Sequence, residues 1–383
     1  MGEIQQIDRP GPRDLGPTAT ALAEACAADA AARDRDDSFV ADNYEHARTA
    51  GLLDAGVPAE LGGGGADIRA LCDMLRRVAH GCSSTALALS MHTHQVAFPA
   101  WRWHNQPQTR DKTEPLLGRI VSEKLVLLSS GGGDWIGGSG KAEPVEGGYR
   151  VTARKVFVSG APAGDLLMTS AVSPEDGGTV IHFPCPMTDP AVSILDTWHT
   201  LGMRGTGSHD VMLDGLFVPD AKVAVKRPAG QWHPVFFILA TVAFPLIYAV
   251  YLGVAERARD IAVGLAAART PSPLLRDRAG RMETALTAAR LAHAHMIATA
   301  ERNAPSADTV NQVMTGRHLV EENAIRTVEL AMELAGGAGF YRKAELERLF
   351  RDVQAARYHP LQKETQSAFA GAIALGHPTD AIY

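Results

Sequence analysis

Cysteine is scarce in this chain, and its scarcity excludes several classes of protein. Four cysteines occur among 383 residues, and none forms a C-x-x-C pair, so neither a zinc site nor a dithiol redox motif is predicted. The N-terminus opens on charged residues and shows no apolar segment of the kind that signal peptides carry. Together these features predict a reduced, cytoplasmic protein with buried thiols.

Long hydrophobic runs and an excess of positive charge are also missing. No run approaches the roughly 20 apolar residues of a membrane span, because the longest candidate, 235–250, is interrupted by Thr241 and Pro245. The formal net charge is −6, which argues against a broad basic surface for nucleic acid. The sequence therefore predicts neither a membrane protein nor a nucleic-acid-binding protein.

The length of the chain predicts more than one packed unit. At 383 residues it exceeds the limit of about 250–300 residues for a single core. An Ala-rich helical pattern fills residues 1–122, a Gly- and Pro-dense region fills 123–228, and long helical segments fill 229–383. We therefore expect three domains with these boundaries.

The middle region shows the pattern of short strands. Short apolar runs alternate there with turn residues such as Gly147 and Gly148, which favours a small antiparallel barrel or sandwich. The expected strands cover 126–128, 149–151, 155–158, 166–169, 179–183 and 211–218.

The C-terminal region is typical of a helical bundle. Its expected helices cover 236–268, 274–304, 306–334 and 344–358, with Ser306 at the start of the third and Gly336-Gly337 at its end. The predicted fold class is therefore α+β and mostly α: an N-terminal helical domain, a middle β-barrel or sandwich, and a C-terminal four-helix bundle.

Five short motifs occur in the order and spacing of one enzyme family. Each alone is modest, because Gly-Gly pairs are common, but five in order are strong evidence for a shared fold. They are VPAELGG at 57–63, SSTAL at 83–87, LGMRGTGS at 201–208 followed by LFVP at 216–219, LGVA at 252–255, and GGAGF at 336–340 with Arg351-Asp352. The chain thereby resembles the acyl-CoA dehydrogenase superfamily over nearly its whole length.

The resemblance implies a flavin, FAD or FMN, at the junction of the β unit and the bundle. It also implies a homo-oligomer, a dimer or tetramer, built by the bundle helices. Residues 155–159 (KVFVS) match the family's strand in which an aromatic packs near the flavin ring and a hydroxyl faces its polar edge. Phe157, Val158 and Ser159 are therefore expected to bind the cofactor, and Ser159 to act catalytically at that edge. An ordinary strand is the alternative.

A glycine-rich loop is a second candidate for the flavin site. Residues 128–134 (LSSGGGD) take the place of the family's Thr-Glu-Pro-x-Ala-Gly-Ser-Asp loop, although the match is poor. Ser129 and Ser130 can replace the threonine that meets the flavin, and the glycines can bring backbone N–H groups close to a ligand. A merely flexible turn is the alternative.

The family's hold on the adenosine end of FAD is altered in this chain. Arg269 stands where the family has an Arg-x-x-Phe-Gly element for the pyrophosphate, and Gly336 and Gly337 form the C-terminal turn of the same site. The Phe-Gly is absent, and Glu333 replaces a glutamine that is usual before the turn. This departure predicts FMN, or a flavin that exchanges readily.

The carboxylate base of the dehydrogenases is also missing. Pro360 falls at its usual position after Arg351-Asp352, with His359 before it, and the alternative position at 243–245 (AFP) holds no acid. Glu364 could serve only if the local backbone differed. These departures resemble the two-component (class D) flavin-dependent monooxygenases, in which a histidine follows the Arg-Asp pair and a separate reductase supplies reduced flavin.

Three histidines and two further side chains are the remaining candidates. His359 and His94 are expected to be catalytic, because imidazole can donate and accept near neutral pH. His92, Trp135 and Arg204 are expected at the substrate. His92 and His94 point about 200° apart on a helix, so they cannot both face one pocket or chelate a metal from one helical face, and His94 is favoured for the pocket. Structural histidines and core aromatics are the alternatives.

Three functions remain open at this point. The first is a flavin-dependent monooxygenase that uses reduced flavin and O2 on a small aromatic, amine or natural-product substrate. The alternative is an acyl-CoA or acyl-carrier dehydrogenase with a non-standard base. The third is a non-catalytic scaffold that kept the fold.

Overall fold

The N-terminal part of the protein is a group of helices packed on one long helix of the bundle. The structure is a computed structural model that describes residues 12–379, so the charged N-terminal stretch noted above lies outside it. Asp67 caps one of these helices by accepting a hydrogen bond from the Ala70 N–H at 2.8 Å. The helices are α1 (Gly16–Arg35), α2 (Ala41–Thr49), α3 (Ile68–Gly81), α4 (Ser83–Asn105) and α5 (Arg110–Glu123).

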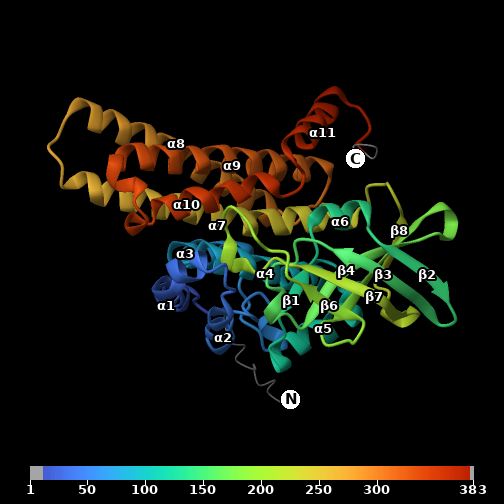
Figure 1. Cartoon of the computed structure of the whole chain (residues 1–383). Helices are drawn as coiled ribbons and strands as arrows, with labels where there is room; N and C mark the ends of the chain where they lie inside the picture. Colours follow the sequence, from blue (N-terminus) through green and yellow to red (C-terminus); the bar gives the residue numbers. More distant parts are fainter. Residues whose placement is uncertain (1–11, 380–383) are drawn as a thin grey trace, which may run out of the picture.

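A single mixed sheet forms the middle of the protein (Figure 1). Its eight strands run in the order β6-β7-β3-β2-β4-β5-β8, with β1 paired in parallel to β4 off this path. Most neighbours are antiparallel, as expected. The strands are β1 (Leu127–Ser129), β2 (Lys141–Val145), β3 (Gly148–Lys155), β4 (Leu166–Ser173), β5 (Thr179–Pro186), β6 (Val192–Leu195), β7 (Asp210–Pro219) and β8 (Val225–Pro228).

The predicted strand at 155–158 is wrong, and its physical reason matters for the site. Strand β3 ends at Lys155, because Phe157 takes a left-handed backbone conformation with φ of 56°. A residue in that conformation cannot continue an extended strand. Strands β2, β6 and β8 were not predicted.

The C-terminal part is the expected helical bundle. The first three predicted helices are confirmed as α7 (Val235–Ala267), α8 (Pro273–Glu301) and α9 (Ala307–Ala335). Ser306 caps α9 through a reciprocal capping box with Thr309, and the helix ends at Gly336. The fourth predicted helix is shorter, because α10 (Leu346–Val353) gives way to a 3₁₀ turn at Gln354–Tyr358. A further helix, α11 (Lys363–Leu375), follows.

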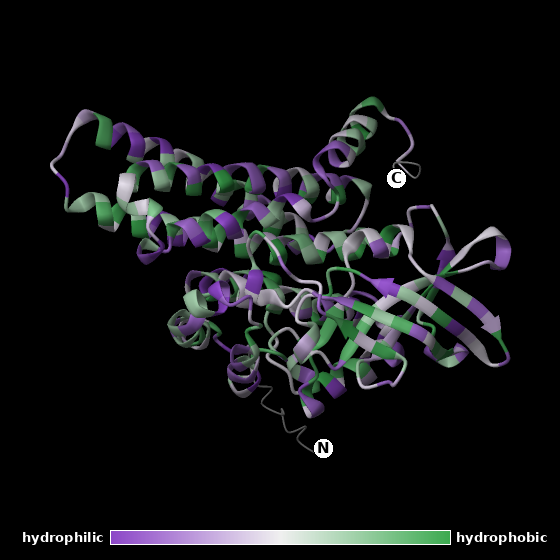
Figure 2. Cartoon of the chain, viewed as in Figure 1, coloured by the Kyte–Doolittle hydropathy of each residue, from purple (hydrophilic) through white to green (hydrophobic). Residues whose placement is uncertain are grey.

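Helix α7 joins the three parts of the molecule. It lies between α8 and α9 on one side and α3 and α4 on the other (Figure 1). Hydrophobic residues follow it along most of its length (Figure 2). By length and composition α7 could cross a membrane, but 78% of its most apolar window is buried inside the protein, as in the core helix of a soluble protein. All four cysteines are buried and unpaired.

Candidate active site

A large cavity opens where the sheet, the N-terminal helices and the bundle meet. Its volume is about 880 Å³, near the upper end of the range of about 300–1,000 Å³ for ligand pockets. Its walls come from α4, the loop after β1, the end of β3, the segment 198–203, α7 and the C-terminal segment 351–365. Every compositional zone of the sequence therefore contributes to one site.

Phe157 presents an aromatic face to this cavity. The side chain is 56% exposed and lines the cavity, and its ring packs edge-on against Trp198 at 5.9 Å. A left-handed backbone at a residue other than glycine costs about 1–3 kcal/mol. The flanking backbone holds it in place, since the Val158 N–H donates to the His209 carbonyl at 3.1 Å. The fold thus maintains a strained aromatic wall beside the cavity.

A chain of hydroxyl groups lies next to that wall. Ser159 and Ser208 share a hydrogen bond of 2.7 Å between their Oγ atoms, and Ser208 shares another of 2.7 Å with the Thr206 hydroxyl. Ser129 and Ser130 line the same cavity. A hydroxyl can turn to donate or accept, so this edge suits the polar rim of a flat heterocycle.

The glycine-rich loop is a short helix rather than a flexible turn. Helix α6 (Gly132–Gly137) is anchored by Asp134, whose two carboxylate oxygens each accept from the buried Lys155 ammonium at 3.0 Å. Arg227 Nη2 donates to the carbonyls of Trp135 and Ile136 at 2.5 and 2.7 Å. These long-range contacts hold α6 against the cavity.

Two features of the loop face a ligand. A Cβ added to Gly132 would lie 2.3 Å from Pro360 Cγ, so only glycine lets the loop approach the C-terminal segment this closely. The Trp135 indole N–H has no partner within the described part of the chain, although Trp135 lines the cavity. A buried donor without a partner is costly and is available to a bound molecule.

His359 lies in the cavity wall and is held at both its ring and its backbone. Its Nε2 is 2.6 Å from the Tyr251 hydroxyl, and its carbonyl accepts a hydrogen bond from Arg317 Nη2 at 2.9 Å. Withdrawal from water, aided by the positive charge of Arg317, lowers the pKa of His359 to about 3. The imidazole is therefore neutral at physiological pH.

His94 and His92 face different surroundings, although both are buried on α4. His94 lines the cavity, and its Nδ1 has no partner among residues 12–379. Burial lowers its pKa to about 4. His92 lies outside the lining: its Nδ1 accepts from the Leu127 N–H at 2.9 Å and its Nε2 donates to the Leu53 carbonyl at 2.8 Å. His92, expected at the substrate, thus ties α4 to β1.

The cavity offers no free carboxylate among the residues that the structure describes. Asp134 is the one acidic side chain in the lining, and it is paired with Lys155. Glu364 is exposed on α11 and does not line the cavity. Ala243 and Phe244 on α7 do line it, and neither is an acid. Neither family position for a carboxylate base carries an acid, and no other free carboxylate among the described residues takes its place in the cavity.

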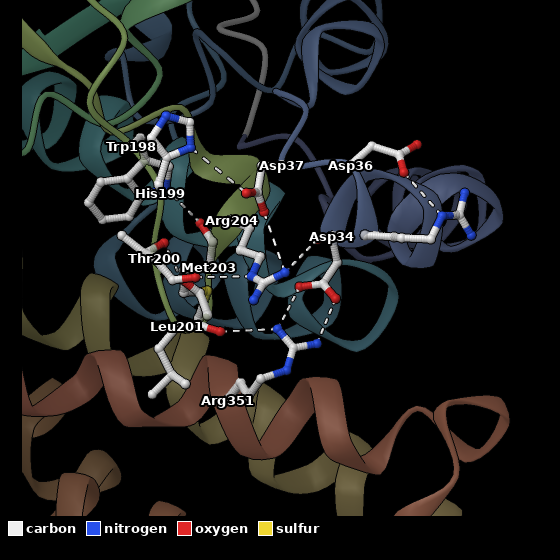
Figure 3. A network of polar contacts seen from close by, with 12 residues as sticks. Asp34, Asp36, Asp37, Trp198, His199, Thr200, Leu201, Met203, Arg204 and Arg351 are labelled. Carbon is white, nitrogen blue, oxygen red and sulfur yellow. Dashed lines mark hydrogen bonds and ion pairs between the residues drawn. The ribbon is translucent and has the colours of Figure 1, made fainter.

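The C-terminal Arg351-Asp352 pair holds the segment 198–203 that lines the cavity, and Figure 3 shows the contacts of Arg351 with Asp34 and Leu201. Arg351 donates to both carboxylate oxygens of Asp34, at 2.9 and 2.6 Å, and to the Leu201 carbonyl at 3.1 Å. Asp352 accepts from the Met203 N–H at 2.5 Å and from the Ser83 hydroxyl. The same pair that carries the family resemblance therefore positions the wall in front of His359.

Several predicted site residues lie away from the cavity. Arg204, expected at the substrate, donates to the Thr200 carbonyl at 3.0 Å and pairs with Asp37 at 3.5 Å (Figure 3). Val158 is fully buried behind Phe157. Arg269 donates to the Leu334 carbonyl at 2.7 Å, where α7 and α9 end beside the Gly336–Gly337 turn. None of these lines the cavity of the single chain.

The sequence interpretation missed Tyr251, the nearest polar partner of His359. Helical spacing could have found it, because Phe244, Ile247 and Tyr251 lie three and four residues apart and share one face of α7. That face of α7 carries no acid, so the family's pattern of a carboxylate base gives no signal for Tyr251.

The residues present fit a flavin. A flat apolar ring would find aromatic walls at Phe157 and Trp198, and its polar edge would find the hydroxyls of Ser159 and Ser208. The unpartnered polar atoms of Trp135 and His94 add hydrogen-bonding capacity. The fold and the site together define a flavin enzyme built on the acyl-CoA dehydrogenase architecture.

The family relationship is shown by comparison with known proteins. Residues 15–117 match the family of acyl-CoA dehydrogenase N-terminal domains. Residues 246–364 match the family of acyl-CoA dehydrogenase C-terminal domains. The amino sugar nitrososynthase RubN8 of Streptomyces rubradiris is 30% identical over 426 residues, covering 100% of this chain and 97% of that protein. The chain belongs to the acyl-CoA dehydrogenase superfamily.

Other relatives identify the branch. The indole-3-acetate monooxygenase of Pseudomonas putida is 25% identical and covers 85% of this chain and 84% of that protein. The solved structure of KijD3 in complex with FMN and dTDP-3-amino-2,3,6-trideoxy-4-keto-3-methyl-D-glucose has a TM-score of 0.86 at 28% identity, covering 96% of this chain and 94% of that one.

These findings confirm the predicted family, fold, flavin and enzyme class. The chain is a flavin-dependent oxidoreductase of the monooxygenase branch of the superfamily, with FAD or FMN as its cofactor.

Proposed function

We propose that the protein binds reduced flavin in the cavity at the junction of sheet and bundle and transfers one oxygen atom of O2 to a small organic substrate, while the other oxygen atom is released as water. The observation that carries this proposal is the chemistry of the lining. Two neutral imidazoles, His94 and His359, face a cavity whose only carboxylate, within the described residues, is committed to Lys155. Dehydrogenation of an acyl thioester needs a free base there, whereas oxygen transfer does not.

The charges of the lining favour a substrate whose buried part is uncharged. Asp134 is paired with Lys155, and Arg351, which is the one arginine or lysine in the described lining, is paired with Asp34 and Glu347. An ion inside the cavity would lose its hydration without gaining a counter-ion, at a cost of several kcal/mol. A neutral amine or an aromatic ring avoids that cost, and the names of the relatives contain both an amino sugar and an indole.

Each wall of the cavity has a distinct proposed role. Bound reduced flavin supplies the electrons that activate O2. Phe157 would pack against its ring and Ser159 would hydrogen-bond its polar edge, together with Ser129 at the end of β1 and Ser130 directly after it. Trp135 and the aromatic side chains of α7 exclude water from the substrate. His359 and His94 orient the substrate or the reacting oxygen by hydrogen bonds.

The flavin that we propose is FMN, delivered by a separate reductase. Support comes from Arg269, which hydrogen-bonds the backbone of its own chain, and from the missing Phe-Gly after it.

We also propose a dimer or tetramer and a cytoplasmic location. Phe340 and Tyr341, at the end of the bundle, are 84% and 71% exposed, as expected if a second copy covers them. Light scattering and cell fractionation test these two points.

The proposed function is tested by following the fate of the electrons. Photoreduced FMN or FAD is mixed with the protein and then with O2, and hydrogen peroxide is measured with and without members of an amine and indole panel. A true substrate lowers the peroxide yield and gives an oxygenated product. Anaerobic bleaching of bound FAD by acyl-CoA thioesters, with no product from the panel, would overturn the proposal in favour of a dehydrogenase.

A further inference from the structure

The contact between Tyr251 and His359 has only one arrangement of hydrogens that satisfies both groups. The Tyr251 hydroxyl lies 2.6 Å from His359 Nε2, and the tyrosine side chain is fully buried on α7. Within residues 12–379 this is the only hydrogen bond that the hydroxyl makes.

The direction of this hydrogen bond follows from counting donors. If His359 Nε2 carried the proton and donated, the Tyr251 O–H would be left buried with no acceptor, which costs free energy. If the hydroxyl donates instead, Nε2 accepts and the single proton of the neutral imidazole lies on Nδ1. The second arrangement leaves no buried donor unsatisfied.

The other ring nitrogen is open to the cavity. His359 lines the cavity. Its Nδ1 has no partner within the described chain, and this atom is not fully buried. An Nδ1–H group would therefore point to space that a ligand can reach.

We propose that Tyr251 is a positioning residue, which donates to His359 Nε2 and thereby keeps His359 in the tautomer whose Nδ1–H donates into the cavity. The inference rests on the proposed function only for its last step, the use of this N–H at the substrate or the reacting oxygen. A carboxylate at this place would accept a proton, whereas His359 in this tautomer offers one.

The surroundings of His359 keep the ring neutral, as one fixed tautomer requires. Arg317 on α9 holds the His359 carbonyl and is itself paired with Glu321 at 3.2 Å. Tyr248 lies edge-on to the imidazole at 6.0 Å, and His94 approaches from α4. Burial and the Arg317 charge both lower the pKa of His359, so no second proton competes.

The chain supplies a matched control on the same helix. The Tyr248 hydroxyl is also buried, but it donates to the Ala356 carbonyl at 2.8 Å and does not line the cavity. Tyr251→Phe and Tyr248→Phe therefore each remove one buried hydroxyl with one hydrogen bond. Only the first removes the partner of the imidazole.

The test is nitrogen NMR of protein with labelled histidine, in which His359→Gln assigns the signal. The unaltered protein and Tyr248→Phe are expected to show His359 protonated at Nδ1, and Tyr251→Phe to lose this preference. Protonation at Nε2 in the unaltered protein would overturn the proposal, and this result does not depend on the folding of Tyr251→Phe. An unchanged signal in folded Tyr251→Phe would overturn it as well.

Turnover gives a second, separable measurement. With an active substrate, Tyr251→Phe should form product about tenfold more slowly at an unchanged KM for substrate, while Tyr248→Phe stays near the parent rate. Equal rates in both variants would overturn the role of the N–H. If the unaltered protein oxygenates nothing, the proposed function fails, while the NMR result on the tautomer stands.

Discussion

Mild acid should unfold this protein. The folded protein keeps several histidine side chains neutral at a pH at which the same side chains would be protonated in the unfolded chain. Five histidines among the described residues have a pKa lowered from 6.5 to about 4 or about 3, and burial is the largest cause for each. They are His92, His94, His182, His293 and His359. Between these values and 6.5 the unfolded chain binds more protons than the folded chain. Stability is therefore complete above pH 6.5 and is lost as the pH falls below it.

The size of the effect follows from proton linkage. One pH unit below 6.5, each such imidazole lowers the free energy of unfolding by about 1.4 kcal/mol. Five of them together reach about 5–7 kcal/mol, a large part of the roughly 5–15 kcal/mol that stabilises a typical domain. Glu256 does not mask the effect, because its pKa is lowered from an ordinary value of 4.5 to about 2 and it therefore titrates below this window.

Urea denaturation at several pH values between about 7.5 and 5.5 measures this dependence. The free energy of unfolding should fall steadily across the lower half of the range. His94→Gln removes one buried imidazole and leaves the other four in place, so its free energy of unfolding should fall by about 1.4 kcal/mol less than that of the parent between pH 7.5 and 5.5. A free energy of unfolding that stays constant from pH 7.5 to 5.5 would refute the claim that these histidines are held neutral.

Three substitutions test other parts of the site. Phe157→Gly relieves a left-handed backbone but removes the aromatic wall, so flavin fluorescence titration should show weaker binding while the melting temperature does not fall. Gly132→Ala places a Cβ against Pro360 and should lower product formation about tenfold or more. Gly133→Ala is the control, because a Cβ there has no atom within 4 Å, and it should leave product formation unchanged. Equal activity of the two variants would contradict the close packing of Gly132 on Pro360. Lys155→Met leaves Asp134 buried without its partner and should cost about 3–5 kcal/mol in urea denaturation, and adding Asp134→Asn should recover part of it.

The order of the domains and the bundle helices could be predicted because their signals are local. Proline and serine mark the start of α9, and a glycine marks its end. The motifs of the family identify the fold in the same way, since each occupies a few consecutive residues.

The details of the cavity could not be predicted, because they depend on contacts between distant residues. The end of β3 follows from the left-handed Phe157, and an aromatic residue carries no sequence signal for that conformation. Helix α6 looks like a flexible glycine run until Lys155 and Arg227 are placed against it. Arg204 belongs to a strong motif, yet its charge is used by Asp37 rather than by a ligand.

The most direct test of the account is the source of the oxygen atom in the product. The protein is supplied with reduced FMN, an amine or indole substrate and isotopically heavy O2, and the product is analysed by mass spectrometry. One heavy oxygen atom is expected in the product, and none when the label is in water. Oxygen that comes from water, or flavin oxidation that yields only hydrogen peroxide with every substrate while acyl-CoA thioesters are dehydrogenated, would contradict it.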